Sequence, residues 1–177
     1  MTAAQPSAAT MMRELIDRGG SAQQPAQDMK DLADVIRALL DVEQGRDTRV
    51  RLGGRLFDVV VSGGGAEGFA VADMLDQVQG GCGPVIHDPD AGWLYWLVPP
   101  GSSAAWPHHS FGVCIGTPHT ITLPHLNHRM PPGAYWLRPS ASDRLVPTRA
   151  LREHLDRFRP QPAPHAALAS RLGATAP

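Results

Sequence analysis

Hydrophobic positions recur at three- and four-residue steps in two segments of this chain, which is the spacing that places side chains on one face of a helix. The first segment is 27–44, and Gly45 follows it as a stop signal. The second ends before Gly80 and Gly81, and its apolar positions are Val71, Met74, Leu75 and Val78. Each segment is therefore predicted to form an amphipathic helix that packs on the rest of the fold.

Short runs rich in β-branched and aromatic residues, bounded by Gly and Pro, predict strands. Two of them, 48–52 and 56–61, flank Gly53-Gly54, which predicts a tight hairpin turn. Four more follow, at 93–98, 111–115, 120–123 and 134–138. Thr148 is the predicted N-cap of a last helix, which ends before closely spaced prolines that start at Pro160.

These elements predict an α+β fold, a mainly antiparallel sheet of short strands covered on one face by two or three helices. Residues 27–158 are predicted to form this single domain. Residues 1–26 are rich in Ala, Gln, Ser and Gly and are predicted to be a mobile arm, and residues 159–177 a Pro- and Ala-rich tail.

Composition and charge narrow the classes of function. The chain has 177 residues, 42% of them hydrophobic, which is enough for one core. It has no apolar run long enough to cross a bilayer and no secretory pattern, so we expect a cytoplasmic protein. A net charge of -1 argues against a broad phosphate-binding surface, although the segment 129–177 carries 8 Arg against 3 acids. That segment could contact nucleic acid, an acidic protein partner or the chain's own acidic N-terminal helix.

A glycine-rich turn offers one alternative function. Gly63, Gly65 and Gly68 have the G-x-G-x-x-G spacing after an apolar strand and at the start of a helix, and Asp88 follows at about the distance of a ribose-binding acid. This pattern is typical of FAD- or NAD-binding proteins, in which the glycines let the backbone approach a pyrophosphate. The surrounding strands favour instead a plain turn between strand and helix, because a dinucleotide domain needs several βαβ units.

Histidines offer a second alternative, a metal-binding protein. The candidate ligands are His87, His119, His125 and His128, and the two cysteines, Cys82 and Cys114, have no paired zinc spacing. Prolines around His125 and His128 favour a loop, in which a three-residue step does not place the two rings on one face.

The stretch from Gly83 to Leu137 contains, in order, a Gly-Pro-Val strand, a turn, a Tyr-containing strand, a Gly-Val strand, an apolar strand that ends in Pro and a Gly-x-Tyr-Trp strand. This order resembles the C-terminal half of the bifunctional primase-polymerase domain of the archaeo-eukaryotic primase superfamily. The segment Leu56 to Val60 is similar to the Ala-Phe-Asp-Val-Val strand of short actinobacterial proteins that carry a truncated domain of this kind. The resemblance covers about residues 49–138.

The resemblance also implies where catalytic groups would lie. Family members keep two Asp separated by one residue, a His that contacts nucleotide phosphates and a third Asp, because metal-bound triphosphate chemistry needs these groups. Here Asp58 has Val60 in place of the second acid, Trp93 stands at the His position and Cys114 at the third Asp. We therefore expect a catalytically inactive relative with no resident cofactor.

Such a relative is expected to be a binding or scaffolding module with weak affinity for nucleotide or nucleic acid. The candidate base-stacking residues are Trp93, Tyr95, Trp96, Tyr135 and Trp136, and the candidate phosphate contacts are Arg129, Arg138, Arg149 and Arg152. The alternative for the aromatic residues is core packing, since neighbouring residues of a strand point to opposite faces.

Overall fold

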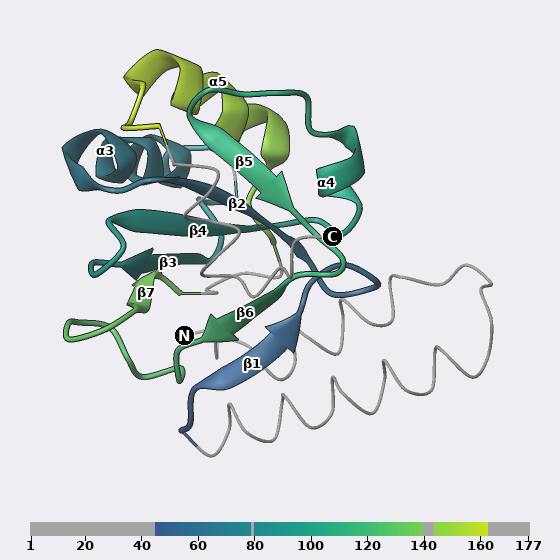
Figure 1. Ribbon diagram of the computed structural model, residues 1–177. Coiled ribbons are helices and arrows are strands. Elements are labelled where there is room, and N and C mark those ends of the chain that lie inside the picture. The colour runs from purple at the N-terminus through teal and green to yellow at the C-terminus, as the bar shows by residue number, and fades with distance from the viewer. Residues whose placement is uncertain (1–44, 79, 140–143, 163–177) are drawn as a thin grey trace, which may run out of the picture.

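The computed structural model describes residues 45–78, 80–139 and 144–162 (Figure 1). The predicted arm at 1–26, the predicted helix at 27–44 and the tail from residue 163 lie outside these ranges. A five-stranded sheet in the order β5-β2-β4-β3-β7 forms the centre of the described part. Its strands are β2 (Asp58–Gly63), β3 (Val85–Asp88), β4 (Trp93–Val98), β5 (Gly112–Ile115) and β7 (Tyr135–Arg138). Every neighbouring pair is antiparallel, which confirms the predicted α+β class.

Strands β2 and β4 lie inside the sheet because both of their faces are apolar. All six residues of each strand are buried. The predicted hairpin between 48–52 and 56–61 is wrong, since β2 pairs with β4 and β5. A turn is present at Gly53 and Gly54, whose φ angles are 82° and 64°, but the chain leaves it for a different layer.

Helices cover one face of the sheet, as predicted. They are α3 (Gly65–Asp76) and α5 (Thr148–Phe158), which lie side by side above the strands in Figure 1. Their buried residues, Val71, Leu75, Leu151 and Leu155 among them, pack with Val60, Leu94, Trp96 and Val98 of the sheet. Thr148 is not the N-cap of α5, because Pro147 occupies that position and no side chain caps the helix.

A two-stranded ribbon covers the opposite face. Strands β1 (Thr48–Arg51) and β6 (Thr120–Leu123) pair with each other and not with the five-stranded sheet. Alternate residues of the ribbon, Val50, Ile121 and Leu123, join the core that contains Val59, Val61, Trp93 and Tyr95. Both faces of the central sheet are therefore filled with apolar side chains.

The connection through α3 is a crossover between two strands that run in the same direction. Strands β2 and β3 are both antiparallel to β4, so they run in the same direction with β4 between them. This arrangement is a split βαβ unit. A short helix that sequence reasoning missed, α4 (Ser102–Ala105), follows β4 after Gly101, whose φ angle is 83°.

Candidate functional site

Asp58, Val60 and Cys114 lie together on the helix-covered face of the sheet. Val60 is directly opposite Cys114 in the register of β2 and β5, and Asp58 precedes Val60 on the same face. Trp93 does not join them. It pairs with Gly63 at the far end of β2, about 17 Å from Asp58 along the strand, and it packs in the core on the opposite face. The structure thus brings together three of the four positions at which the resemblance implies catalytic groups.

Asp58 has a structural partner. Its side chain is buried, and Oδ2 accepts a hydrogen bond of 2.8 Å from the backbone N–H of Ser103 in α4. Oδ1 has no hydrogen-bond partner among the described residues. Gly116 allows this approach, because a Cβ at that residue would lie 2.8 Å from Oδ1. The carboxylate therefore ties the first turn of α4 to the sheet.

Cys114 is a neutral thiol beside this carboxylate. Burial and then the negative charge of Asp58 raise the pKa of Cys114 to about 12. Burial and the charge of Asp76 do the same to Cys82, with a pKa also of about 12. Because thiolates and not thiols are nucleophiles and metal ligands, neither side chain has that chemistry at neutral pH.

Burial removes most of the candidate stacking residues. Trp93, Tyr95, Trp96 and Trp136 are each at most 7% exposed. The indole N–H of Trp96 donates to Ser62 Oγ at 2.8 Å, and that of Trp136 donates to the carbonyl of Pro124 at 2.9 Å. Tyr135 is half-buried, and its hydroxyl lies 2.9 Å from Nδ1 of His87. These rings are core side chains, so the prediction that they stack on bases is wrong for the four Trp and Tyr residues that are buried.

The four candidate phosphate contacts differ in how they are paired. Arg138 joins β7 to α3 through Asp73 at 2.6 Å and Asp76 at 2.7 Å, and Arg129 donates to the carbonyl of Leu126. Burial alone would lower the pKa of Arg138, but the two carboxylates outweigh it and raise the value. Arg138 therefore has a structural role, because its ion pairs hold β7 against α3.

The other two arginines are exposed on α5. Arg149 pairs with Glu153 at 3.0 Å, whereas Arg152 has no ion pair or hydrogen bond within the described ranges. Since ion pairs between exposed side chains contribute little, Arg149 can exchange its partner for another anion.

The glycine-rich turn is filled by the chain itself. A Cβ at Gly63 would lie 2.4 Å from the carbonyl oxygen of Gln161, and one at Gly68 would lie 2.5 Å from the carbonyl oxygen of Gly63. Gly64 donates its N–H to the carbonyl of Gly92. The glycines thus allow close packing of backbone on backbone at this turn.

Asp88 does not face this turn as a ribose-binding acid would. Its Oδ1 accepts from the backbone N–H of Ala91 at 3.0 Å, and its Oδ2 accepts from the hydroxyl of Tyr95 at 3.4 Å. Every neighbouring pair of strands in the sheet is antiparallel, whereas a dinucleotide domain has a parallel sheet. The geometry therefore lends no support to the alternative prediction of an FAD or NAD site at Gly63, Gly65, Gly68 and Asp88, which stays a prediction.

The candidate metal ligands do not converge. His87 contacts Tyr135 and Phe69, and its pKa is lowered by burial in spite of the nearby charge of Asp88. His119 lies against the carbonyl of Gly116. His125 and His128 stack with their ring centroids 5.1 Å apart. Within residues 45–78, 80–139 and 144–162, no group of three His, Cys, Asp or Glu side chains could hold a metal ion.

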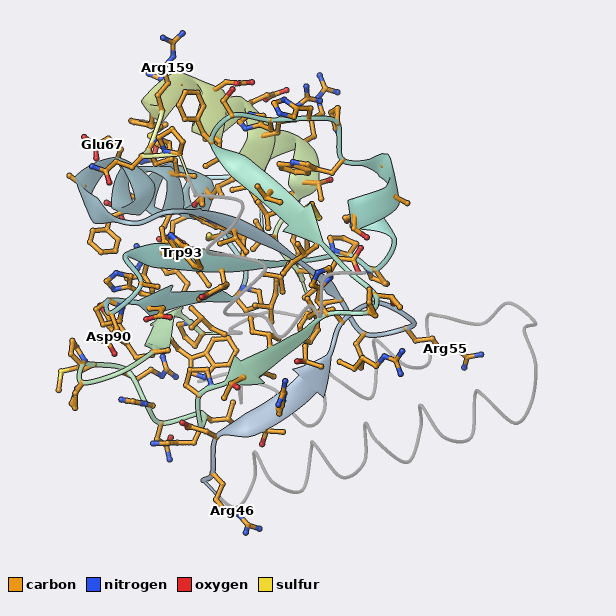
Figure 2. The ribbon with its side chains drawn as sticks, viewed as in Figure 1. Arg46, Arg55, Glu67, Asp90, Trp93 and Arg159 are labelled. Atoms are coloured by element: carbon orange, nitrogen blue, oxygen red, sulfur yellow. The ribbon has the colours of Figure 1, made fainter. Side chains whose placement is uncertain are left out.

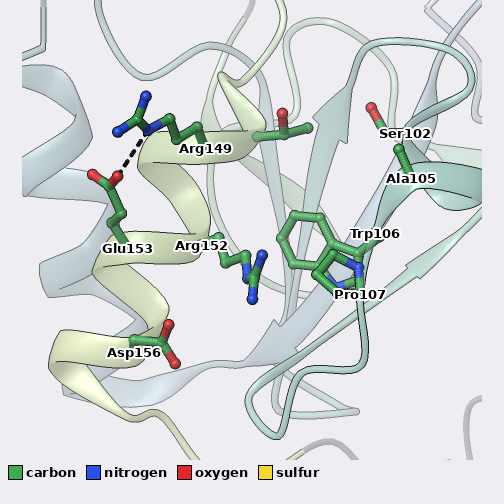
Figure 3. A pocket seen from close by; sticks show the side chains of 9 residues that line it. Ser102, Ala105, Trp106, Pro107, Arg149, Arg152, Glu153 and Asp156 are labelled. Carbon is green, nitrogen blue, oxygen red and sulfur yellow. Dashed lines mark hydrogen bonds and ion pairs between the residues drawn. The ribbon is translucent and has the colours of Figure 1, made fainter.

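A cleft of about 400 Å³ lies between α4 and α5 (Figure 3). Its walls are Ser102, Ala105, Trp106 and Pro107 on one side and Thr148, Arg149, Arg152, Glu153 and Asp156 on the other. The indole N–H of Trp106 donates to the carbonyl of Gly112 at 3.0 Å, which fixes the half-buried ring in the wall. In Figure 3 the guanidinium group of Arg152 extends toward this ring.

Both carboxylates of the cleft have neighbours of their own. Glu153 is the partner of Arg149, and Asp156 Oδ1 lies 3.1 Å from Nε2 of the buried His109. These two atoms are close enough for an ion pair, but their geometry is not that of a hydrogen bond. Nδ1 of His109 accepts the N–H of Phe111 at 3.2 Å. The two arginines and two carboxylates of the cleft thus balance in formal charge, and Arg152 is the arginine of the pair without an ion pair among the described residues.

Sequence reasoning missed Trp106. The signal was its position in a loop beside Pro107, because an aromatic side chain outside a strand is more often available to a ligand than one inside the sheet.

The chain matches no protein-family model, no curated protein and no solved structure in the comparisons made with known proteins. None of the helices in the described ranges has the length and apolar character needed to span a membrane.

Proposed function

We propose that this chain is a catalytically inactive primase/polymerase-like module that binds a nucleotide, or a short single strand, weakly in the cleft between α4 and α5. The observation that carries the proposal is the placement of Trp106 and Arg152 in one cleft. A flat aromatic ring can stack on any base, and a guanidinium group can bind the adjoining phosphate.

The surroundings of Asp58 support the inactive part of the proposal. Phosphoryl transfer on nucleotides needs several oxygen ligands that hold divalent cations. Around Asp58, the facing residues are Val60 and the neutral thiol of Cys114, and one carboxylate oxygen is already bonded to Ser103. One carboxylate with an apolar neighbour and a thiol is a poor cradle for Mg²⁺ or Mn²⁺.

The size and charge of the cleft support weak binding of a small unit. Its volume of about 400 Å³ lies near the lower end of small-molecule sites. Its two arginines and two acids balance in formal charge, and only Arg152 among these arginines lacks an ion pair within the described residues, which suits one phosphate better than a triphosphate. If the chain is instead a scaffold that binds only protein, neither a nucleotide nor a single strand should bind in the cleft.

Binding is tested with a fluorescently labelled oligo-dT and with AMP. We expect dissociation constants of about 10⁻⁴–10⁻⁶ M at low salt. Arg152→Gln and Trp106→Leu should each weaken binding about tenfold, because each removes a phosphate or stacking contact. Arg157→Gln, a change of the same type on an exposed arginine of α5 outside the cleft, is the control. Equal affinity of all four proteins would refute the cleft as the site and leave the scaffold interpretation.

Inactivity is tested separately by primer extension with Mg²⁺ and with Mn²⁺. We expect no incorporation above a reaction without protein. Incorporation that is lost in Asp58→Asn would overturn the inactive assignment, whatever the binding result.

A further inference from the structure

The outer face of the ribbon formed by β1 and β6 carries arginine and threonine side chains. Residues of β1 alternate between buried and exposed, with Arg49 and Arg51 exposed. In β6, Thr122 is exposed and Thr120 is partly exposed. Arg49 is directly opposite Thr122, and Arg51 is directly opposite Thr120. The outer face is thus a square of two arginines and two threonines, and it contains no acid.

This arrangement is a consequence of the fold. The other face of the ribbon lies on the central sheet through Val50, Ile121 and Leu123, so the alternating partners must point away from the sheet. In Figure 1 the ribbon lies on the side of the sheet opposite to α3 and α5. Arg49 and Arg51 lie two residues apart on β1, and the pairing with β6 sets Thr122 and Thr120 opposite them.

The arginines are available for a ligand. Arg49 donates one N–H to the hydroxyl of Thr120 at 3.1 Å, which holds the side chain along the ribbon and leaves its other donors unused. Arg51 has no hydrogen bond or ion pair within the described ranges. Asp88 lines a hollow beside the ribbon and accepts from Ala91 and Tyr95, and Asp47, which precedes β1, accepts from the N–H of His125.

We propose that the outer face of the β1–β6 ribbon is a second binding surface, which contacts the backbone of double-stranded DNA in its major groove. Two strands about 4.8 Å apart fit a groove about 12 Å wide, and this groove admits a two-stranded ribbon. Arginine and threonine donate to phosphate oxygens and to base edges. The face has no aromatic side chain, so it lacks the stacking platform of a single-strand site.

The same geometry distinguishes the two kinds of duplex. Double-stranded RNA has a deep and narrow major groove that side chains do not reach, so the ribbon should prefer DNA. The inference does not depend on the proposed function, because it uses residues on the opposite side of the sheet from the α4–α5 cleft.

The experiment measures binding of the full chain to a labelled DNA duplex of about 16 base pairs at NaCl concentrations from about 25 to about 200 mM. In this range, affinity that depends on phosphate contacts changes with salt concentration. The test variant is Arg49→Gln/Arg51→Gln. The matched control is Arg157→Gln/Arg159→Gln, which removes the same charge from the last turn of α5; Figure 2 shows Arg159 at the opposite end of the molecule from Arg46, which precedes the ribbon.

We expect the slope of log K against log salt to fall by about 2 in the ribbon variant, since each phosphate contact contributes about 0.9. The control should keep the wild-type slope, and an RNA duplex of the same sequence should bind more weakly than DNA. Equal slopes for both variants, or no duplex binding by the wild type at 25 mM NaCl, would overturn the inference. Binding of oligo-dT and its loss in Arg152→Gln should be unchanged in the ribbon variant, so failure of this surface and failure of the cleft are separate results.

Discussion

Replacing Asp58 by Asn tests whether this carboxylate is a structural cap or a ligand for metal. In the structure Oδ2 accepts from Ser103 N–H, and buried Oδ1 has no hydrogen-bond partner among the described residues. A hydrogen bond to a charged group contributes about 1.5–3 kcal/mol and one between neutral groups about 0.5–1.5 kcal/mol, so the change loses about 1 kcal/mol at Ser103. It also removes a buried charge with an unpaired oxygen, which costs about 1–3 kcal/mol or more.

The sum predicts that Asp58→Asn leaves the free energy of unfolding unchanged or raises it by up to about 2 kcal/mol. Asp58→Ala should lower it by about 1–3 kcal/mol, because the Ser103 N–H then has no acceptor and a void remains. Urea unfolding measures both, and 2 kcal/mol corresponds to a midpoint shift of about 1 M.

Mn²⁺ supplies the decisive arm of this experiment. If Asp58 is only a structural cap, Mn²⁺ should leave the urea midpoint of unfolding of the wild-type protein unchanged. A midpoint that rises with Mn²⁺ in the wild type and not in Asp58→Asn would refute the reasoning, because it would identify the carboxylate as a ligand. A loss of stability of more than about 1 kcal/mol in Asp58→Asn alone would also contradict it, since Oδ1 would then have a stabilising partner.

Three further predictions concern the packing. Gly68→Ala should destabilise the fold by about 1–3 kcal/mol with no cofactor added, because its Cβ would meet a backbone oxygen and Leu94; thermal unfolding that is unchanged would mean that the turn has free space. Cys82 and Cys114 should react with iodoacetamide at pH 8 only in urea, since the pKa of each is about 12 in the fold; rapid labelling of the native protein would contradict this. Arg138→Met should lower stability in low salt and less in 1 M NaCl, where its two half-exposed ion pairs are screened; a loss independent of salt would assign the effect to packing.

The individual elements could be predicted from local pattern. The strand at 93–98 forms as its run of aromatic and β-branched residues indicates, and the helix that contains Val71 and Leu75 forms as its spacing indicates. Pairing could not be predicted in the same way. Strands 48–51 and 58–63 are neighbours along the chain but belong to different layers, since β2 is buried on both faces and lies inside the sheet between β4 and β5.

The candidate site shows the same division. Residue type does not distinguish Trp96, which is completely buried, from Trp106, which forms the wall of a cleft; only the position of Trp106 beside Pro107, outside the predicted strands, does so. Burial depends on which layers cover a strand. The glycine-rich turn likewise has the local spacing of a cofactor loop, but Gln161 and Gly92 from elsewhere in the chain pack against it.

The amino-acid sequence by itself determined the α+β class, most element boundaries and the absence of paired acids around Asp58, because these depend on local spacing and residue type. Tertiary structure decided which groups meet. It placed Asp58 under α4, set Trp106 beside Arg152, buried the aromatic strand residues and paired Arg49 and Arg51 of β1 with the threonines of β6. These outcomes follow from contacts between residues far apart in the chain, which local propensity does not specify.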